Sequence, residues 1–252
     1  MLSYDRIQDI ALLEDLSMTA WPAPRRIIHG GWALYFAAGH TGRANSANAV
    51  VPLATIDDAT ITLFETEYRR QGLAPMFRLT PLTPPDLGAR LAVRGYGIAS
   101  ESKVFWRSLK DMGGAAPDAA VRVQDRLDKA WMDAYRRMVP VPEVEMPALM
   151  SILTGIAVRT RFATLWQDGE PVAACLAVLD RDWVGFFKVA CRADRRGQGL
   201  PRRLMQDMMG RAAAEGAVGA YLQVGAGNAP ALALYARLGF QHLYDYAYAK
   251  LG

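Results

Sequence analysis

The segment around residues 189–204 constrains the fold more than any other part of this 252-residue chain. Apolar residues from 183 to 191 predict a strand, Gly197 and Gly199 mark a turn, and a helix is predicted over 201–215. A strand that enters a helix through such a turn points several backbone N–H groups and the positive helix end at one spot. The two glycines permit dihedral angles and a close approach that side chains would block. The segment therefore predicts a site that holds a pyrophosphate.

Arginine side chains add positive charge to this segment. Five of them fall within twelve residues, and Asp194 is the only acidic residue among them. They are Arg192, Arg195, Arg196, Arg202 and Arg203. Such a cluster favours a multiply charged anion, and a solvated basic helix face is the alternative. The whole chain carries a net charge of only +4 at pH 7, which does not by itself indicate nucleic acid, and we expect no nucleic-acid partner.

The C-terminal half shows alternating strand and helix patterns. Strands are predicted over 121–123, 162–167, 171–179, 183–191, 220–224 and 241–251, and helices over 125–138, 146–154, 201–215 and 229–238. Asp168 and Gly169 are a strong signal for a hairpin turn between two of the strands. This order predicts an α/β (α+β) fold in which helices cover both faces of a central mixed sheet.

The N-terminal half shows a weaker version of the same order. Helices are predicted over 5–18, 57–71 and 85–94, and strands over 32–38, 76–80 and 102–109. A strand, a loop, a proline-led helix, a glycine and an aromatic residue recur in 76–96 and in 221–240, which suggests an internal duplication. The alternative is that two separate units share common turn residues. Glycine, alanine and proline in 110–118 predict a linker between the halves.

Several other classes of protein do not fit the sequence. A P-loop would need a Lys-Ser/Thr ending, and a Rossmann fingerprint would need a third glycine where Arg202 stands. Cys175 and Cys191 lie in apolar segments, so we expect both thiols in the core. The three histidines are scattered and lack the spacing of a zinc site, so no metal is expected. The longest apolar run, 172–179, has eight residues, whereas a membrane span needs about 20. The N-terminal segment lacks a secretory pattern, so we expect a cytoplasmic protein with no membrane partner.

Two motifs resemble the signatures of a known family. Residues 196–201 read Arg-Gly-Gln-Gly-Leu-Pro and resemble the Arg/Gln-x-x-Gly-x-Gly/Ala signature of the GNAT superfamily of N-acetyltransferases. Residues 228–240, with Asn228, Tyr235 and Gly239-Phe240, look like the other signature of that family. The clear resemblance covers 118–252, which is then expected to be a GNAT acetyltransferase domain that binds acetyl-CoA. Residues 1–110 look like a degenerate GNAT-like domain without the glycine motif, as in tandem GNAT proteins.

The resemblance implies an acetyl-CoA site between two splayed parallel strands, 183–191 and 220–224. The residues implied for the pantetheine arm are Val189, Ala190, Cys191 and Asn228, and the backbone of the first and third would pair with its amides like an added strand. The residues implied for the pyrophosphate are Arg196, Gly197, Gln198, Gly199, Leu200, Pro201 and Arg202. Tyr235 would protonate the leaving thiolate, a role that suits a phenol because it keeps its proton at neutral pH. A core aromatic on an amphipathic helix is the alternative for Tyr235.

Pro201 departs from the family pattern, which has glycine or alanine at this position. Proline has no N–H, so one donor toward the anion is lost, at a cost of about 1.5–3 kcal/mol. Proline is otherwise favoured at the first position of a helix. Arg202 and Arg203 would offset the lost donor.

We therefore expect an N-acetyltransferase that moves an acetyl group from acetyl-CoA to a primary amine of a small molecule or peptide by direct attack. The alternative is a catalytically inactive acyl-CoA-binding regulatory module. Glu143 and Glu145 are candidates for the general base by analogy of position, and solvated loop carboxylates are the alternative. The polar loop 39–46 is a candidate lining of a substrate cleft between the halves, or else an ordinary surface loop. A homodimer is left open.

Overall fold

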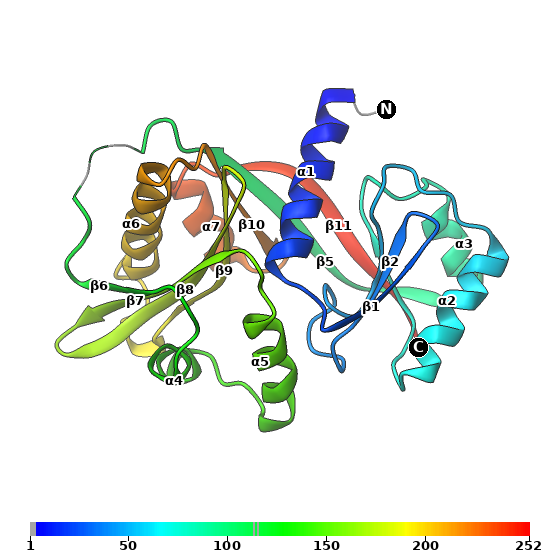
Figure 1. Ribbon diagram of the computed structural model, residues 1–252, viewed down its shortest axis with the longest axis horizontal. Helices are drawn as coiled ribbons and strands as arrows, with labels where there is room; N and C mark the ends of the chain where they lie inside the picture. Colours follow the sequence, from blue (N-terminus) through cyan, green and yellow to red (C-terminus); the bar gives the residue numbers. More distant parts are fainter. Residues whose placement is uncertain (1–3, 113, 115) are drawn as a thin grey trace. The chain divides into compact units, whose positions relative to one another are not determined.

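The computed structural model of the chain describes residues 4–112, 114 and 116–252 (Figure 1). No helix in these ranges combines the length and the apolar character that a membrane crossing requires. The described residues divide into two compact units, and the chain passes from one to the other more than once.

The two units are not consecutive stretches of the chain. The segments of unit 1 are 4–104, Pro147–Gly155 and Leu243–Gly252. The segments of unit 2 are the described residues of Phe105–Met146 and Ile156–His242. The predicted linker 110–118 belongs to unit 2, and its residues Gly113 and Ala115 lie outside the described residues. The assignment of separate domains to 1–110 and 118–252 stays a prediction.

The sheet strands of unit 2 follow the order β10-β9-β8-β7-β6. They are β6 (Val121–Gln124), β7 (Arg159–Gln167), β8 (Glu170–Asp180), β9 (Trp183–Cys191) and β10 (Gly219–Gly225). Neighbouring strands are antiparallel except for β9 and β10, which are parallel. The middle strand, β8, is buried along almost its whole length, as expected for a strand covered on both faces.

Helices cover both faces of this sheet, as the sequence predicted. They are α4 (Lys129–Met138), α6 (Leu200–Ala214) and α7 (Ala229–Arg237). α6 and α7 contribute to the same apolar core as Ala163 of β7, whereas Trp131 of α4 packs edge-on against Phe162, with 5.0 Å between ring centres. Side chains alternate between the faces along a strand, so Phe162 and Ala163 point to opposite sides of the sheet. The predicted mixed sheet with helices on both faces is therefore confirmed.

Local sequence signals fix a turn and a helix start in this unit. Asp168 and Gly169 have positive φ angles of 52° and 78°, as a type I′ turn requires, so the predicted hairpin between β7 and β8 is confirmed. The helix predicted to start at residue 125 begins only at Lys129. The reason is a cap, because the side chain of Asp128 accepts a hydrogen bond of 2.7 Å from the N–H of Trp131.

The sheet strands of unit 1 follow the order β1-β2-β3-β4-β11. They are β1 (Arg25–His29), β2 (Trp32–Phe36), β3 (Ala47–Ala49), β4 (Met76–Leu79) and β11 (Gln241–Leu251). The helices are α1 (Tyr4–Ala20), α2 (Asp58–Arg70), α3 (Leu87–Val93) and α5 (Met146–Thr154). Strand β5 (Tyr96–Ser108) and strand β11 each begin in one unit and end in the other. The sequence predicted these helices and strands except β1 and β3.

A buried ion pair joins three elements of unit 1. Arg78 of β4 is only 1% exposed and donates through both of its Nη atoms to Glu14 of α1, with 2.9 Å between Nη2 and Oε1. Tyr244 of β11 donates its hydroxyl to the same carboxylate, and the ring centre of Tyr246 lies 3.9 Å from the guanidinium carbon of Arg78. The first helix and the last strand of the chain are therefore held together inside this unit.

Candidate active site

The parallel strands β9 and β10 diverge at their C-terminal ends. Their paired register ends at Phe186 and Leu222, whereas β9 runs on to Cys191 and β10 to Gly225. A register shift between β8 and β9 accompanies a positive φ of 51° at Lys188, which marks a bulge in β9. A bulge bends the strand that carries it. An open wedge therefore lies between the two strands beyond their last pair.

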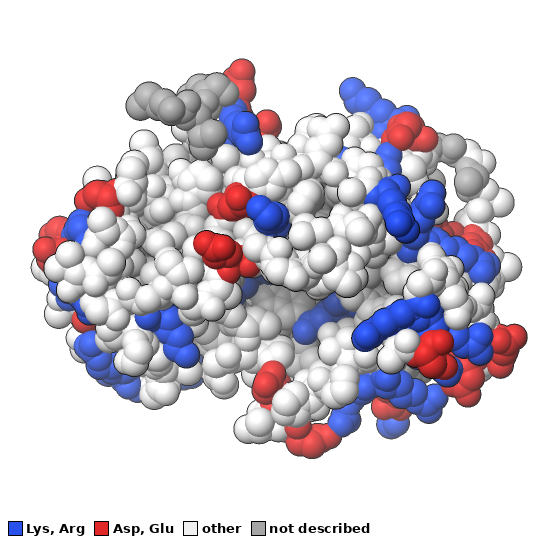
Figure 2. Space-filling view, turned by 180° about the vertical axis from the view of Figure 1, so that it is seen from behind, with Lys and Arg blue, Asp and Glu red and all other residues white. Residues whose placement is uncertain are grey.

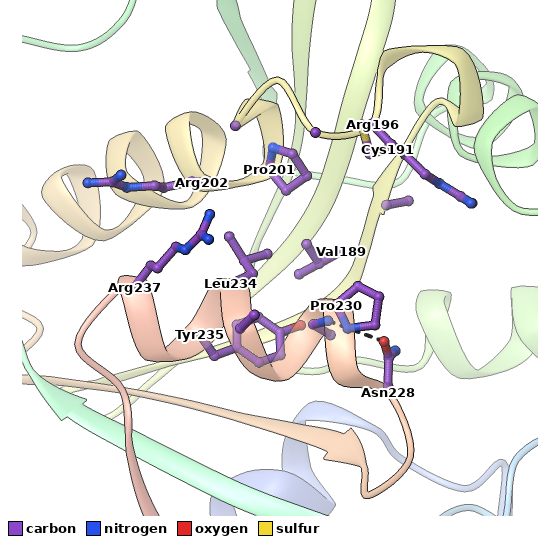
Figure 3. A pocket seen from close by; sticks show the side chains of 15 residues that line it. Val189, Cys191, Arg196, Pro201, Arg202, Asn228, Pro230, Leu234, Tyr235 and Arg237 are labelled. Atoms are coloured by element: carbon purple, nitrogen blue, oxygen red, sulfur yellow. Dashed lines mark hydrogen bonds between the residues drawn. The ribbon is translucent and has the colours of Figure 1, made fainter.

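A cavity of about 610 Å³ lies at this wedge (Figure 3). It is lined by the end of β9, the glycine loop, the start of α6 and one side of α7. All the predicted site residues line it except Gln198 and Leu200. Gln198 is exposed on the loop, and Leu200, the first residue of α6, is buried in the core. The structure thus brings together residues from β9, the loop and α7, and their roles stay predictions.

The sequence missed several residues of α7 that line the same cavity. They are Pro230, Ala231, Ala233, Leu234 and Arg237. Pro230, Leu234 and Arg237 are spaced four and then three residues apart, which places them on one face of a helix. Only Ala231 of these residues lies one helical turn from Tyr235, so spacing from the tyrosine alone does not identify the face that carries Arg237.

The glycines of the loop are required by their backbone conformation. Gly197 and Gly199 have φ angles of 78° and 73°, a region that residues with a side chain rarely adopt. No other protein atom lies within 4 Å of a Cβ built on either residue, so crowding by the protein is not the reason. Gly199 is the N-cap of α6, which makes Leu200 the first helical residue and Pro201 the second. The helix was predicted to start at Pro201, one residue too late.

Three arginines give the cavity its charge. Arg196, Arg202 and Arg237 line it, and none of them forms an ion pair with another described residue. No aspartate or glutamate of the described chain lines the cavity. The positive charge is therefore not neutralised by the protein, which is the state expected of a site for a multiply charged anion.

The other three arginines of the predicted cluster are paired with carboxylates. Arg203 donates to Asp118 from Nε at 2.6 Å and from Nη2 at 2.9 Å. Arg192 donates in the same two-pronged manner to Asp194, and Arg195 reaches Asp168 at 3.4 Å. Acidic and basic side chains accordingly lie next to each other over this unit in the space-filling view (Figure 2). Asp194 is the only acidic residue within the sequence cluster, and residues distant in sequence, Asp118 and Asp168, supply the other carboxylates.

Asn228 has a structural partner at the start of α7. Its Oδ1 accepts a hydrogen bond of 3.2 Å from the N–H of Ala231, so the side chain caps the helix (Figure 3). The cap occupies one of the two acceptor sites of this oxygen, which leaves the second site and the amide nitrogen for a ligand. The predicted contact of Asn228 with the pantetheine arm stays a prediction.

Tyr235 is held against the core and faces the cavity. It is 7% exposed, and its ring packs edge-on against Phe240 with 6.0 Å between ring centres. Its hydroxyl points into the cavity from α7 (Figure 3). Burial raises the pKa of Tyr235 to about 12, and the thiol of Cys175 adds to this effect. The phenol is thus protonated throughout the neutral range, as a proton donor must be.

Cys191 is the cysteine that lines the cavity. Burial raises the pKa of its thiol, and the nearby charge of Arg196 only partly opposes this shift. The thiolate form is the nucleophile in cysteine chemistry, so a raised pKa keeps Cys191 in its unreactive form at neutral pH.

The two carboxylates predicted as base candidates lie away from the cavity. Glu143 and Glu145 form a short 3₁₀ helix, η1, and neither lines the cavity. The side chain of Glu143 is 77% exposed and pairs with Arg136. The alternative interpretation, a solvated loop carboxylate, therefore describes Glu143 better than that of a base.

The polar loop 39–46 belongs to unit 1 and is tied together by Asn45. The Oδ1 of Asn45 accepts hydrogen bonds from the N–H groups of Ala37 and Gly39, at 2.8 and 2.9 Å. Its Nδ2 donates to the carbonyls of His40 and Thr41, both at 2.8 Å. These contacts explain why an asparagine stands at position 45, since its side chain holds the loop backbone together. A role of the loop in substrate binding stays a prediction.

The diverging parallel strands, the glycine loop that opens α6 and the helices on both sheet faces define a GNAT-type acyltransferase. The family described as "Probable histone acetyltransferase Rv0428c C-terminal" matches residues 7–249, and the chain belongs to this family.

Relatives of known sequence or structure agree with this assignment. The "Uncharacterized N-acetyltransferase YobR" of Bacillus subtilis (strain 168) is 23% identical over 247 residues, which cover 96% of this chain and 98% of the relative. A GCN5-related N-acetyltransferase from Kribbella flavida superposes with a TM-score of 0.70 at 18% identity, over 95% of this chain and 94% of that one. A tandem GNAT protein from the clavulanic acid biosynthesis pathway gives a TM-score of 0.61 at 14% identity, over 96% and 86%. At these identities the two structures show the fold alone.

Proposed function

We propose that this chain transfers an acetyl group from acetyl-CoA to a primary amine of a small molecule or peptide by direct attack. The observation that carries the proposal is the basic cavity at the wedge between β9 and β10, with a protonated Tyr235 facing into it. Membership of an acetyltransferase family supports the reaction class, and the printed name of that family supports peptide amines among the acceptors.

The residues of the cavity fit coenzyme A. Its size, about 610 Å³, lies in the range of small-molecule sites. Arg196 and Arg202 would hold the phosphate groups, together with N–H groups of the glycine loop and the positive end of α6. The unpaired ends of β9 and β10 would leave the backbone at Val189 and Cys191 for the pantetheine amides. Asn228 would contact the same arm.

The chain contributes an acid to the transfer itself. Acetyl-CoA supplies a thioester carbon that a neutral amine can attack, with release of the thiol. The Tyr235 hydroxyl would give its proton to the departing sulfur as the carbon–sulfur bond breaks, and it would regain a proton from the acceptor nitrogen or from solvent. Cys191 is not used as a nucleophile because its raised pKa keeps it a thiol, which favours direct attack over an acetyl-cysteine.

Two observations favour a second function, an acyl-CoA-binding regulatory module without turnover. No described carboxylate lines the cavity, and Pro201 removes a backbone donor from the first turn of α6. A cytoplasmic location is part of the proposal as a sequence-based expectation, and a homodimer stays open.

The deciding experiment follows release of free thiol from acetyl-CoA with a panel of amino acids, polyamines, aminoglycosides and lysine-containing peptides. The transferase predicts amine-dependent thiol release with at least one class of acceptor. Tight binding of acetyl-CoA by calorimetry without release for any acceptor would favour the regulatory module. Absence of both would contradict both functions.

A further inference from the structure

Two of the cavity arginines come from different helices. Arg202 lies in the first turn of α6 and Arg237 at the end of α7, and both side chains line the cavity (Figure 3). Arg196 lies at the other side of Pro201, toward the end of β9 (Figure 3). In this view, arginines therefore line the cavity on both sides of Pro201.

Helix stability does not explain the pair. A cation in the first turn of a helix opposes the helix dipole, so the position of Arg202 is unfavourable for α6 on its own. Neither Arg202 nor Arg237 has a carboxylate partner among the described residues, whereas their neighbour Arg203 has one in Asp118. Two positive charges that line the same cavity without a counter-charge repel each other. An anion with two charges would remove that repulsion.

We propose that Arg202 and Arg237 form a subsite for a phosphate monoester dianion, the 3′-phosphate of coenzyme A. The inference rests on the proposed function and deepens it. In this arrangement the glycine loop and Arg196 would bind the pyrophosphate, in which each phosphate group carries one negative charge. A phosphate monoester carries nearly two charges at pH 7 and has three acceptor oxygens, so it suits two guanidinium groups that arrive from different elements.

The space around Arg237 supports this arrangement. The same side chain borders a second cavity of about 540 Å³, which is also lined by Trp106, Gln206 and Gln241. A group held by Arg237 therefore has room beside it for the rest of the nucleotide. A ring from Trp106 and two amide side chains are partners suited to a nucleoside.

The test compares coenzyme A with 3′-dephospho-coenzyme A, which lacks only this phosphate. Calorimetry at 0.15 M salt gives the Kd of each ligand for the native chain and for Arg237→Gln, Arg202→Gln and Arg196→Gln. We expect the native chain to bind coenzyme A at least about tenfold more tightly than the dephospho form. In Arg237→Gln and Arg202→Gln this preference should shrink severalfold, mainly through weaker binding of coenzyme A. In Arg196→Gln both ligands should weaken by a similar factor.

Arg203→Gln is the matched control, because it removes the same charge from the same helix turn but from a side chain bound to Asp118. It should leave the preference unchanged. Equal binding of both ligands by the native chain, or an equal loss of both in Arg237→Gln, would overturn the subsite while leaving the proposed transferase intact. Failure of the native chain to bind either ligand would overturn the proposed function and the subsite together.

Discussion

Among single residues, Arg196 offers the most direct test of the phosphate site, because it lines the cavity and has no ion pair among the described residues. Charge-assisted hydrogen bonds to phosphate are worth about 1.5–3 kcal/mol. Arg196→Ala should therefore weaken coenzyme A binding about 10- to 150-fold. The free energy of unfolding without ligand should change by less than about 0.5 kcal/mol, since the side chain is exposed.

Calorimetry of binding and urea denaturation of the same samples check both halves of this prediction. Arg203→Ala serves as the control, because its partner is Asp118 and its side chain does not line the cavity. It should leave the Kd within about twofold of the native value. Unaltered affinity in Arg196→Ala would remove this residue from the phosphate site.

Tyr235 makes a separate prediction about pH. Because burial raises its pKa to about 12, the phenol keeps its proton across the whole range in which an amine acceptor loses one. The rate should rise with pH as the acceptor becomes neutral and then stay level to about pH 11. Tyr235→Phe should lower kcat about 100-fold or more and leave the Kd of coenzyme A within about twofold, because the ring and its packing on Phe240 remain.

The pH–rate profile of the native chain and of Tyr235→Phe is the measurement. A fall in native kcat centred near pH 10 and missing from the phenylalanine variant would mean that Tyr235 titrates at its ordinary pKa. An unchanged kcat in the variant would remove Tyr235 from the chemistry.

A site residue can be predicted from the sequence where a local backbone requirement determines its type, and it cannot where distant contacts determine its role. Gly197 and Gly199 were predictable, because a backbone with a positive φ favours glycine over other residue types. The charge state of the arginines was not, because Arg203 is neutralised by Asp118, which is 85 residues away in the chain. Arg237 was missed for the related reason that the packing of α7 on the sheet decides which of its faces borders the cavity.

At the level of elements, we expect alanine substitution to have opposite effects on stability at the N-cap and in the interior of α6. Gly199 caps the helix with a φ of 73°, so Gly199→Ala forces a left-handed conformation that costs a residue with a side chain about 1–2 kcal/mol. Gly210 lies inside the helix with open space around its Cβ position, so Gly210→Ala should stabilise the chain by about 0.4–1 kcal/mol. Urea denaturation measures both, and a stabilised Gly199→Ala would contradict the cap.

The elements that the sequence failed to predict lack a pattern of their own. β1 places two adjacent isoleucines among charged residues and is mostly exposed, so it has no alternation of apolar and polar side chains. β3 is only Ala47–Ala49, and its short Ala-Asn-Ala sequence has little strand preference. Both are fixed by pairing with β2, a tertiary contact that local periodicity does not contain. β9 and β11, with long apolar or aromatic alternation, were predicted with the observed bounds.

At the level of the whole molecule, a buried ion pair between Glu14 and Arg78 links α1 to β4 within unit 1. Glu14→Gln would leave Arg78 charged and buried without its counter-charge. Loss of one partner of a buried pair costs about 3–5 kcal/mol. The double variant Glu14→Gln/Arg78→Met should cost less than the sum of the single variants, because it leaves no buried charge alone.

Urea denaturation of the four proteins in this cycle is the measurement. Arg69→Gln is a surface control, because Arg69 pairs with Glu65 from a side chain that is 54% exposed, and it should cost no more than about 1 kcal/mol. Additive effects of the two single variants would mean that the two side chains do not act as a pair.

The exchange of segments between the units predicts that the C-terminal half does not fold well alone. A fragment of residues 118–252 would lack Phe105, which packs edge-on against His242 with 5.6 Å between ring centres. It would also carry 243–252 without unit 1, and so expose Tyr244 and Tyr248, which are 4% and 7% exposed in the whole chain. Such an exposed apolar segment favours aggregation. We expect this fragment to be less soluble than the whole chain and to melt at a lower temperature.

A fragment of residues 105–242 is the matched comparison, because it restores Phe105 and removes the aromatic end of β11. It should melt at a higher temperature than 118–252 and bind coenzyme A more tightly, since the cavity is built from unit 2 alone. Thermal unfolding and calorimetry of both fragments beside the whole chain decide between the two divisions. Cooperative unfolding of 118–252 with the coenzyme A affinity of the whole chain would support consecutive domains at 1–110 and 118–252. Loss of coenzyme A binding in both fragments would mean that the chain must be complete before unit 2 can form its site.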